Sequence, residues 1–285
     1  MIPEVTLTAK TFADLSGWRK ISLTGSNAVI WLNAQVTTDV SWLRPGSSQR
    51  CLLLDDAGGL QADFTAAVSG SSILLIQDPA QRESVADLLR PLAGGTDVDL
   101  EERSTELAIL AFPTRPAAPD LGGTSFYSPS TLGPGADIVC LAEDRRRLAG
   151  SLAKTFTFAG PDDLEAWRIA AGRARLGVDA RVGDWPAEVG FDAVVDLTKA
   201  GFRGREAVYR RPASTPLRTS VVALSAPEPV SPGDLLMVDG TAVGELTSVT
   251  GTEEGIAALG RVRWPKRGGP FSTDSGVGLE LREVP

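Results

Sequence analysis

The chain has 285 residues, of which 42% are hydrophobic and 22% charged, and its formal net charge is −8. An acidic surface of this kind repels a phosphate backbone, which argues against nucleic acid as a partner. No apolar run approaches the roughly 20 residues needed to span a bilayer, and histidine is absent, which removes imidazole from catalysis and metal binding. We therefore expect a cytoplasmic α+β protein with no membrane partner and no metal.

The first part of the chain predicts an open sheet with helices on one face. Its predicted strands cover residues 21–24, 51–55, 60–68, 71–76, 98–100 and 107–111, with a hairpin turn at 56–59. One helix is expected to begin after Asn27, with Ile30 among its apolar positions, and a second at Asp78-Pro79, with Leu89 on its apolar face.

Residues 113–135 are rich in proline, glycine and serine and are typical of a connector. A second unit follows, with a strand at 137–141, helices at 143–154 and from Pro161, and an irregular segment at 177–190. After Pro216 short strands alternate with turns at 219–224, 235–238, 242–249, 256–262 and 277–281, which predicts a small antiparallel barrel. We expect three parts, at 1–117, 118–213 and 214–285, of which the first two can interleave.

Carboxylates and thiols offer few candidates for chemistry. Asp63 follows a turn that contains Asp55 and Asp56, and a carboxylate at the start of a returning strand is a candidate electrostatic or proton-transfer group. Ordinary turn chemistry explains Asp55 or Asp56. The cysteines, Cys51 and Cys140, lie inside apolar runs, so we expect both to be buried thiols without chemistry.

The stretch from Lys199 to Arg211 is strongly basic, with a local charge of +4. A cationic patch on an acidic chain is a candidate anion site, and Arg203 and Arg205 suit bidentate carboxylate recognition. The alternative is that these side chains pair with nearby acids such as Asp192 or Asp196. Upstream, a carboxylate at Asp184 or Glu188, beside an aromatic ring, could hydrogen-bond a flat heterocycle, whereas the alternative is an ordinary proline turn.

Several motifs in the same order resemble the folate-binding T-protein superfamily. They are Ile21–Ala28, Leu32-Asn-Ala-Gln-Val-Thr-Thr-Asp-Val40, Val243-Gly-Glu-Leu-Thr-Ser248 and Ala257–Val262. The run from Lys199 to Glu206 is similar to the signature of its YgfZ branch, Lys-Gly-Cys-Tyr-x-Gly-Gln-Glu. Lys199, Phe202, Gly204 and Glu206 fit that pattern, whereas Gly201 replaces the cysteine and Arg205 the glutamine.

The resemblance implies three subdomains in a ring around tetrahydrofolate or a derivative. It implies that Glu188 contacts the pterin with Trp185 beside it, and that Lys199, Arg203 and Arg205 meet anionic parts of the ligand or line its entrance. In the similar aminomethyltransferases an aspartate at this turn assists at the folate nitrogen, and an Asp-Asp pair follows the turn, but here the matching positions are Ala62 and Asp63.

These features favour a folate-binding YgfZ-like accessory or regulatory protein, without classical catalysis, in the assembly or repair of iron–sulfur client proteins. Because Gly201 removes the signature thiol, that role would have to proceed without it. One alternative is an aminomethyltransferase-like one-carbon transferase that uses Asp63, and another is an interaction module that has lost the ligand.

Overall fold

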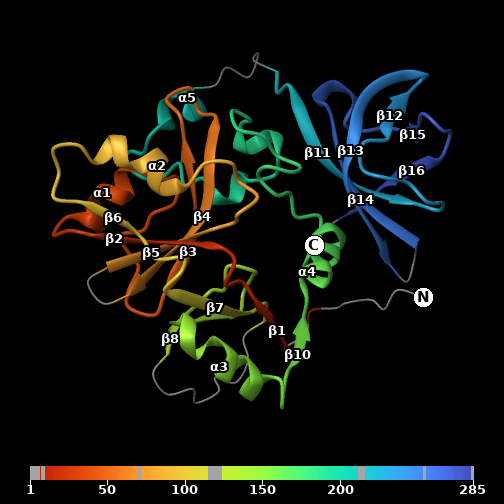
Figure 1. The fold of residues 1–285 in the computed structure, drawn as a ribbon. Coiled ribbons are helices and arrows are strands. Elements are labelled where there is room, and N and C mark those ends of the chain that lie inside the picture. The colour runs from red at the N-terminus through yellow and green to blue at the C-terminus, as the bar shows by residue number, and fades with distance from the viewer. Residues whose placement is uncertain are drawn as a thin grey trace. The chain divides into compact units, whose positions relative to one another are not determined.

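The computed structural model describes residues 7, 10–69, 72–114, 124–210, 216–252 and 255–283 (Figure 1). These residues form two compact units. The N-terminal unit comprises 7–160 and 194–205, and the C-terminal unit comprises 161–193 and 206–283 within the described ranges. Among the described residues, none of the helices is both long enough and apolar enough to cross a membrane. The chain has the predicted mixture of helices and sheets.

The first sheet of the N-terminal unit is antiparallel, and its described strands run in the order β3-β4-β5-β2-β6 (Figure 1). They are β2 (Arg19–Thr24), β3 (Ser48–Leu54), β4 (Leu60–Ser69), β5 (Ser72–Gln77) and β6 (Asp99–Glu102). Helix α1 (Ala28–Gln35) packs Leu32 into the same apolar core as Ile21 and Leu53. The predicted hairpin is confirmed, but Ile30, expected on the apolar face of α1, is 71% exposed.

Helix α2 (Val85–Leu89) begins later than predicted. Asp78 does not cap a helix, because its carboxylate accepts the backbone N–H of Ala80 in a local turn. The fully buried Gln77 side chain accepts the N–H of Val85 and donates to the carbonyl of Glu83, which holds the intervening loop. The helix therefore starts at Ser84, whose hydroxyl accepts the N–H of Ala86, and it continues into a 3₁₀ turn, η1 (Arg90–Ala93).

The second sheet of this unit has its described strands in the order β10-β1-β7-β9-β8. They are β1 (Thr11–Asp14), β7 (Leu107–Phe112), β8 (Ser125–Tyr127), β9 (Ala136–Leu141) and β10 (Thr157–Ala159). Helix α3 (Arg145–Leu152), which follows the 3₁₀ turn η2 (Ala142–Asp144), covers it through Leu148 and Leu152. The strand at 107–112 thus joins β9 rather than the first sheet, and β8 lies within the expected connector. The predicted boundary at 117 and 118 falls outside the described residues.

The C-terminal unit contains the predicted antiparallel barrel, which is closed, and helix α4 (Pro161–Ala170) of the same unit packs against it (Figure 1). The barrel order is β11-β14-β13-β12-β15-β16. The strands are β11 (Thr219–Ala226), β12 (Leu235–Val238), β13 (Thr241–Thr252), β14 (Gly255–Arg263), β15 (Phe271–Thr273) and β16 (Gly278–Leu281), with η5 (Trp264–Lys266) after β14. Sequence patterning missed β15, because three residues are too few to show an alternation.

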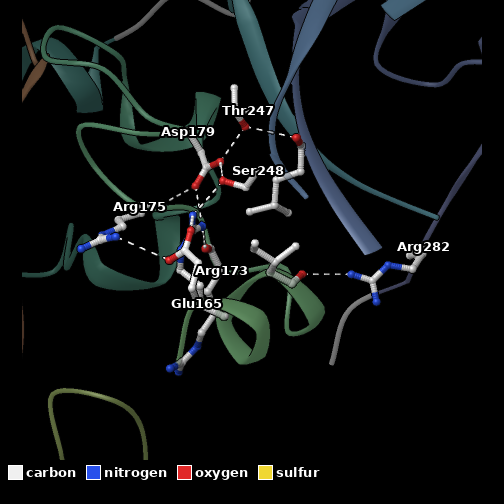
Figure 2. Close-up of polar contacts among 10 residues, drawn as sticks. Glu165, Arg173, Arg175, Asp179, Thr247, Ser248 and Arg282 are labelled. Atoms are coloured by element: carbon white, nitrogen blue, oxygen red, sulfur yellow. Dashed lines mark hydrogen bonds and ion pairs between the residues drawn. The ribbon is translucent and has the colours of Figure 1, made fainter. Parts of the chain in front are cut away.

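A buried ionic network joins α4 and the irregular segment after it to strand β13 (Figure 2). The Asp179 carboxylate is fully buried and accepts from the hydroxyls of Thr247 and Ser248, at 2.6 and 2.7 Å. Its other oxygen lies 2.7 Å from Nη1 of Arg168, which also pairs with Glu165 through Nη2. Every oxygen of this buried carboxylate therefore has a donor, and the segment at 173–180 is held against the barrel.

Candidate functional site

Glu188 lies in the C-terminal unit, at the end of a 3₁₀ turn, η3 (Pro186–Glu188), and is only 1% exposed. Its Oε2 accepts the backbone N–H of Trp185 at 3.0 Å and Nη2 of Arg218 at 2.9 Å. Its Oε1 accepts the backbone N–H of Arg218 at 2.5 Å and, more weakly, Nε of the same residue at 3.3 Å. The carboxylate is thus a preorganised acceptor beside the start of β11.

The electrostatics of this carboxylate follow from the same contacts. Burial acts to raise the pKa of Glu188, but the hydrogen bonds from Arg218 and from backbone N–H groups outweigh it and hold the pKa below its ordinary value. Arg218 has its own pKa raised, first by its hydrogen bond to Glu188. Its side chain is 62% exposed, so the guanidinium can leave the carboxylate without unpacking the core.

Next to Glu188 in sequence lie a half-buried indole ring and an acid that forms an ion pair. Trp185 is half-buried where η3 begins. Asp184, the alternative carboxylate of this segment, is buried and forms a bidentate pair with Arg261 at 2.5 and 2.7 Å. Phe191 is also buried, at 2% exposure. Of the two acids, only Glu188 is held by a side chain that solvent reaches freely.

Lys199 lies in the N-terminal unit and is 6% exposed. Its ammonium donates to the carbonyl oxygens of Asn33, Val36 and Thr38, at 2.6, 2.7 and 3.0 Å, which accounts for each of its N–H groups. Two of these carbonyls lie near the C-terminal end of α1, where a cation is favourable. Burial lowers the pKa of Lys199, and nearby Asp39 opposes this. In this arrangement Lys199 anchors the signature loop to α1.

The two signature glycines have different surroundings. Gly204 has a φ of +79°, and a Cβ added there would collide with the carbonyl oxygen of Asp55 in the β3–β4 turn. Gly201 has no atom within 4 Å of an added Cβ and is exposed. Glycine is therefore required at 204 by a close backbone approach, whereas position 201 has room for a side chain.

The remaining basic residues of the signature make specific contacts. Arg203 pairs through Nε with Asp56 at 3.0 Å, and Asp56 is 87% exposed. Arg205 donates from Nη2 to the carbonyl of Leu197 at 2.9 Å. Glu206 belongs to the C-terminal unit and lies in helix α5 (Arg205–Tyr209). It forms an exposed ion pair with Arg210, which follows the helix. The acidic partners of these arginines are Asp56 and Glu206, rather than the expected Asp192 or Asp196. Arg211 falls outside the described residues.

Asp63 lies on β4 of the N-terminal unit, opposite Leu52. Its carboxylate forms a bidentate pair with Arg50 of β3, with Nε to Oδ1 at 2.8 Å and Nη2 to Oδ2 at 2.7 Å. The Arg50 guanidinium fixes the direction of this carboxylate, which suits electrostatic stabilisation of a cation. Asp55, by contrast, accepts the N–H groups of Ala57 and Gly59, as turn chemistry predicts.

Both cysteines are buried, as expected. Burial raises the pKa of Cys51 to about 12 and raises the pKa of Cys140, so neither is a ready nucleophile. Cys51 nevertheless interacts electrostatically with Lys199, a proximity that their separation in sequence did not indicate. In the part of the chain that the structure describes, no cluster of three or more cysteine, aspartate and glutamate residues is placed to hold a metal ion.

Sequence reasoning missed Arg218, the partner of Glu188. It lies 30 residues further along the chain, at the start of the barrel, and no local pattern marks it. Only the pairing of η3 with β11 brings the two together.

Comparison with known proteins identifies a family domain and several relatives. Residues 4–114 match the GCVT N-terminal domain family. An aminomethyltransferase of Frankia alni is 33% identical over 109 residues, which are 38% of this chain and only 29% of that protein's length. One of Streptomyces coelicolor is 26% identical over 272 residues, with 82% and 73% of the two chains covered. A putative chloroplastic transferase of Arabidopsis thaliana is 25% identical, with 95% of this chain and 69% of that protein covered.

Among solved structures, the glycine cleavage system aminomethyltransferase T from Bartonella henselae superposes with a TM-score of 0.82. The likeness covers 96% of this chain and 85% of that chain at 20% sequence identity, and it therefore concerns the fold. Residues 4–114 therefore match the GCVT N-terminal domain family, and the chain shares the fold of an aminomethyltransferase.

Proposed function

We propose that this GcvT-like chain binds tetrahydrofolate or a derivative and acts as a YgfZ-like accessory or regulatory protein. The observation that carries the proposal is the buried, ionised Glu188 carboxylate, held beside the half-buried Trp185 and covered by one exposed arginine. A reduced pterin presents parallel N–H donors on a flat ring, which is the chemistry that a fixed carboxylate and an indole accommodate.

The residues present fit the pterin end of such a ligand. Arg218 now places two N–H groups, Nε and Nη2, against the two oxygens of Glu188. A pterin would offer a similar pair of donors to the same acceptors. Because the backbone N–H bonds of Trp185 and Arg218 to Glu188 do not depend on the Arg218 side chain, the carboxylate would keep its position when that side chain moves.

The signature loop would serve the remainder of the ligand. Lys199 holds the loop through α1, and Arg203 and Arg205 supply the positive charge for anionic parts of the ligand or for its entrance. The role in iron–sulfur client assembly or repair belongs to the same proposal. Since Gly201 carries no thiol, this role would rest on binding or regulation, in a cytoplasmic setting without membrane or nucleic-acid partners.

The test is calorimetric titration of the full chain with tetrahydrofolate. Glu188→Gln and Glu188→Ala should each weaken binding at least tenfold, while Glu228→Gln, an exposed acid of the barrel unit, should bind as the wild type does. Melting curves of the variants separate a lost contact from a lost fold. Absence of binding heat for the folded wild type up to millimolar ligand would end the proposal.

Gly201→Cys provides an independent check on the signature. Because the space around an added Cβ is open, the variant should fold with unchanged stability. If it acquires an activity in iron–sulfur enzyme maintenance that the wild type lacks, the scaffold around position 201 is intact. If folate binds but the variant gains nothing, folate binding stands and the iron–sulfur role loses its support.

A second candidate is aminomethyl or one-carbon transfer, favoured by the relatives that carry the name aminomethyltransferase. The residue for it is Asp63, whose carboxylate would stabilise positive charge at a folate nitrogen while Arg50 fixes its direction. Methylenetetrahydrofolate formation that is lost in Asp63→Asn would support it. A chain that binds folate and turns over no aminomethyl carrier would leave the accessory role. A chain that folds but binds no folate would be an interaction module on the same fold.

A further inference from the structure

Two segments of the N-terminal unit are joined into one rigid surface beside the signature. The hydroxyls of Thr37 and Thr38 both donate to the carbonyl of Val194, at 2.7 and 3.0 Å. The backbone N–H of Asp196 donates to the carbonyl of Thr37 at 3.0 Å, and Lys199 donates to that of Thr38. The segment at 37–42 is therefore fixed to the segment at 194–199, although more than 150 residues separate them.

Trp42 projects from this surface and is 77% exposed. Its indole does not rotate freely, because Nε1–H donates to Oδ2 of Asp39 at 2.7 Å. The other oxygen of Asp39 accepts the backbone N–H and the hydroxyl of Ser41, at 2.9 and 2.6 Å, which fixes the carboxylate in turn. An exposed tryptophan held in one orientation has already lost the conformational freedom that binding would otherwise remove.

Two carboxylates, those of Asp39 and Asp196, belong to the joined segments that carry this ring. Asp196 lies close enough to Asp39 for the two carboxylates to repel each other. Hydrogen bonds from the Ser41 side chain hold the pKa of Asp39 below its ordinary value, and those from the Thr198 side chain do the same for Asp196. Both carboxylates stay ionised at neutral pH. Of the cations nearby in sequence, Lys199 is buried beneath the surface and points its ammonium at backbone carbonyls, Arg205 donates to the carbonyl of Leu197, and Arg44 is exposed.

We propose that the surface formed by Trp42, Asp39 and Asp196 docks a basic segment of a partner protein. An arginine or lysine of that segment lies over the indole ring while a neighbouring cation pairs with the carboxylates. A cation over a tryptophan face is attracted by the ring quadrupole, and tryptophan is enriched among the residues that dominate binding energy at interfaces. This surface involves neither Glu188 nor Asp63, so it does not depend on the folate proposal.

The experiment uses the full chain and four fluorescent 12-residue glycine–serine peptides. Each peptide carries two copies of one residue, which is arginine, lysine, citrulline or glutamate. Binding is followed by fluorescence polarisation at 50 and 300 mM NaCl. The arginine peptide should bind most tightly and weaken with salt, and the citrulline and glutamate peptides should not bind. Trp42→Ala and the double variant Asp39→Asn/Asp196→Asn should each weaken the arginine peptide at least threefold.

Two matched controls separate a specific surface from general attraction to an acidic chain. Glu228→Gln/Asp274→Asn removes the same charge from exposed loops of the other unit, and Val182→Ser removes an apolar side chain that is 63% exposed there. Both should bind as the wild type does. Equal binding of arginine and citrulline peptides, or equal weakening by the charge control, would overturn the proposal. So would a Trp42-dependent dimer in sedimentation, which would assign the surface to a second copy of the chain.

Discussion

Replacement of Lys199 by methionine tests whether the signature lysine is a structural anchor. Methionine keeps the length of the apolar stem but removes the N–H donors, so the carbonyls of Asn33, Val36 and Thr38 lose their bonds. A buried acceptor left without a donor costs about 1–3 kcal/mol. The bond to Val36 is the buried one, whereas water can reach the other two carbonyls, and the removed ammonium was itself costly to bury.

We therefore expect Lys199→Met to lower the free energy of unfolding by about 2–4 kcal/mol, a large part of the 5–15 kcal/mol typical of a domain. Urea denaturation gives the total, and hydrogen exchange followed by mass spectrometry locates the loss. Amides of α1 and of residues 194–199 should exchange faster, whereas those of β11 in the other unit should not change.

The matched control is Lys154→Met, which removes an exposed lysine from the same unit and should change stability by less than about 0.5 kcal/mol. Lys199→Arg should not restore the wild-type stability, because a planar guanidinium cannot direct donors at three carbonyls around one nitrogen. If Lys199→Met is as stable as the control, the contacts carry no stability and the anchoring argument is wrong.

Three further substitutions test other parts of the structure. Asp179→Ala should cost about 3–5 kcal/mol in thermal denaturation, because it leaves the Arg168 guanidinium without its buried partner; a change below 1 kcal/mol would show that Glu165 suffices. Gly204→Ala should cost more than about 2 kcal/mol and Gly201→Ala less than about 0.5, and equal costs would contradict the close approach at 204. The pKa of Glu188 is lower in the folded protein, so its ionised form stabilises the fold at pH values above the unfolded pKa, and this stabilisation is lost as the pH falls through the folded pKa. In Glu188→Gln this part of the acid dependence of stability should vanish. An unchanged dependence of stability on pH in the variant would refute the argument.

Local patterns were sufficient for most elements of the chain. The alternation before and after the Asp56–Gly59 turn predicted a hairpin, and the structure pairs Cys51 with Phe64 across it. The repeated short strands after Pro216 predicted a barrel, and β11 to β16 close one. In both cases the signal lies within a few residues, because strand alternation and turn chemistry are local properties.

Errors occurred where a distant side chain competes with a local signal. Asp78-Pro79 is a good helix start by itself, but Arg19 and Gln77 hold the following loop and delay α2 to Val85. The order of the elements predicts that residues 107–111 belong to the first sheet, whereas β7 pairs with residues 136–141 of the second sheet. The exposed position of Ile30 likewise depends on which face of α1 the sheet covers.

For the candidate site, the sequence by itself determined which groups are available: no imidazole, a carboxylate at Asp63, Glu188 three residues from Trp185, and a basic run with glycine at position 201. Only the tertiary structure decided what those groups contact. It buries Lys199 on the carbonyls of α1, pairs Asp63 with Arg50 and covers Glu188 with Arg218. The physical reason is that the residue type fixes a side chain's charge and hydrogen-bonding capacity. Its partners depend on how segments far apart in the chain pack against one another.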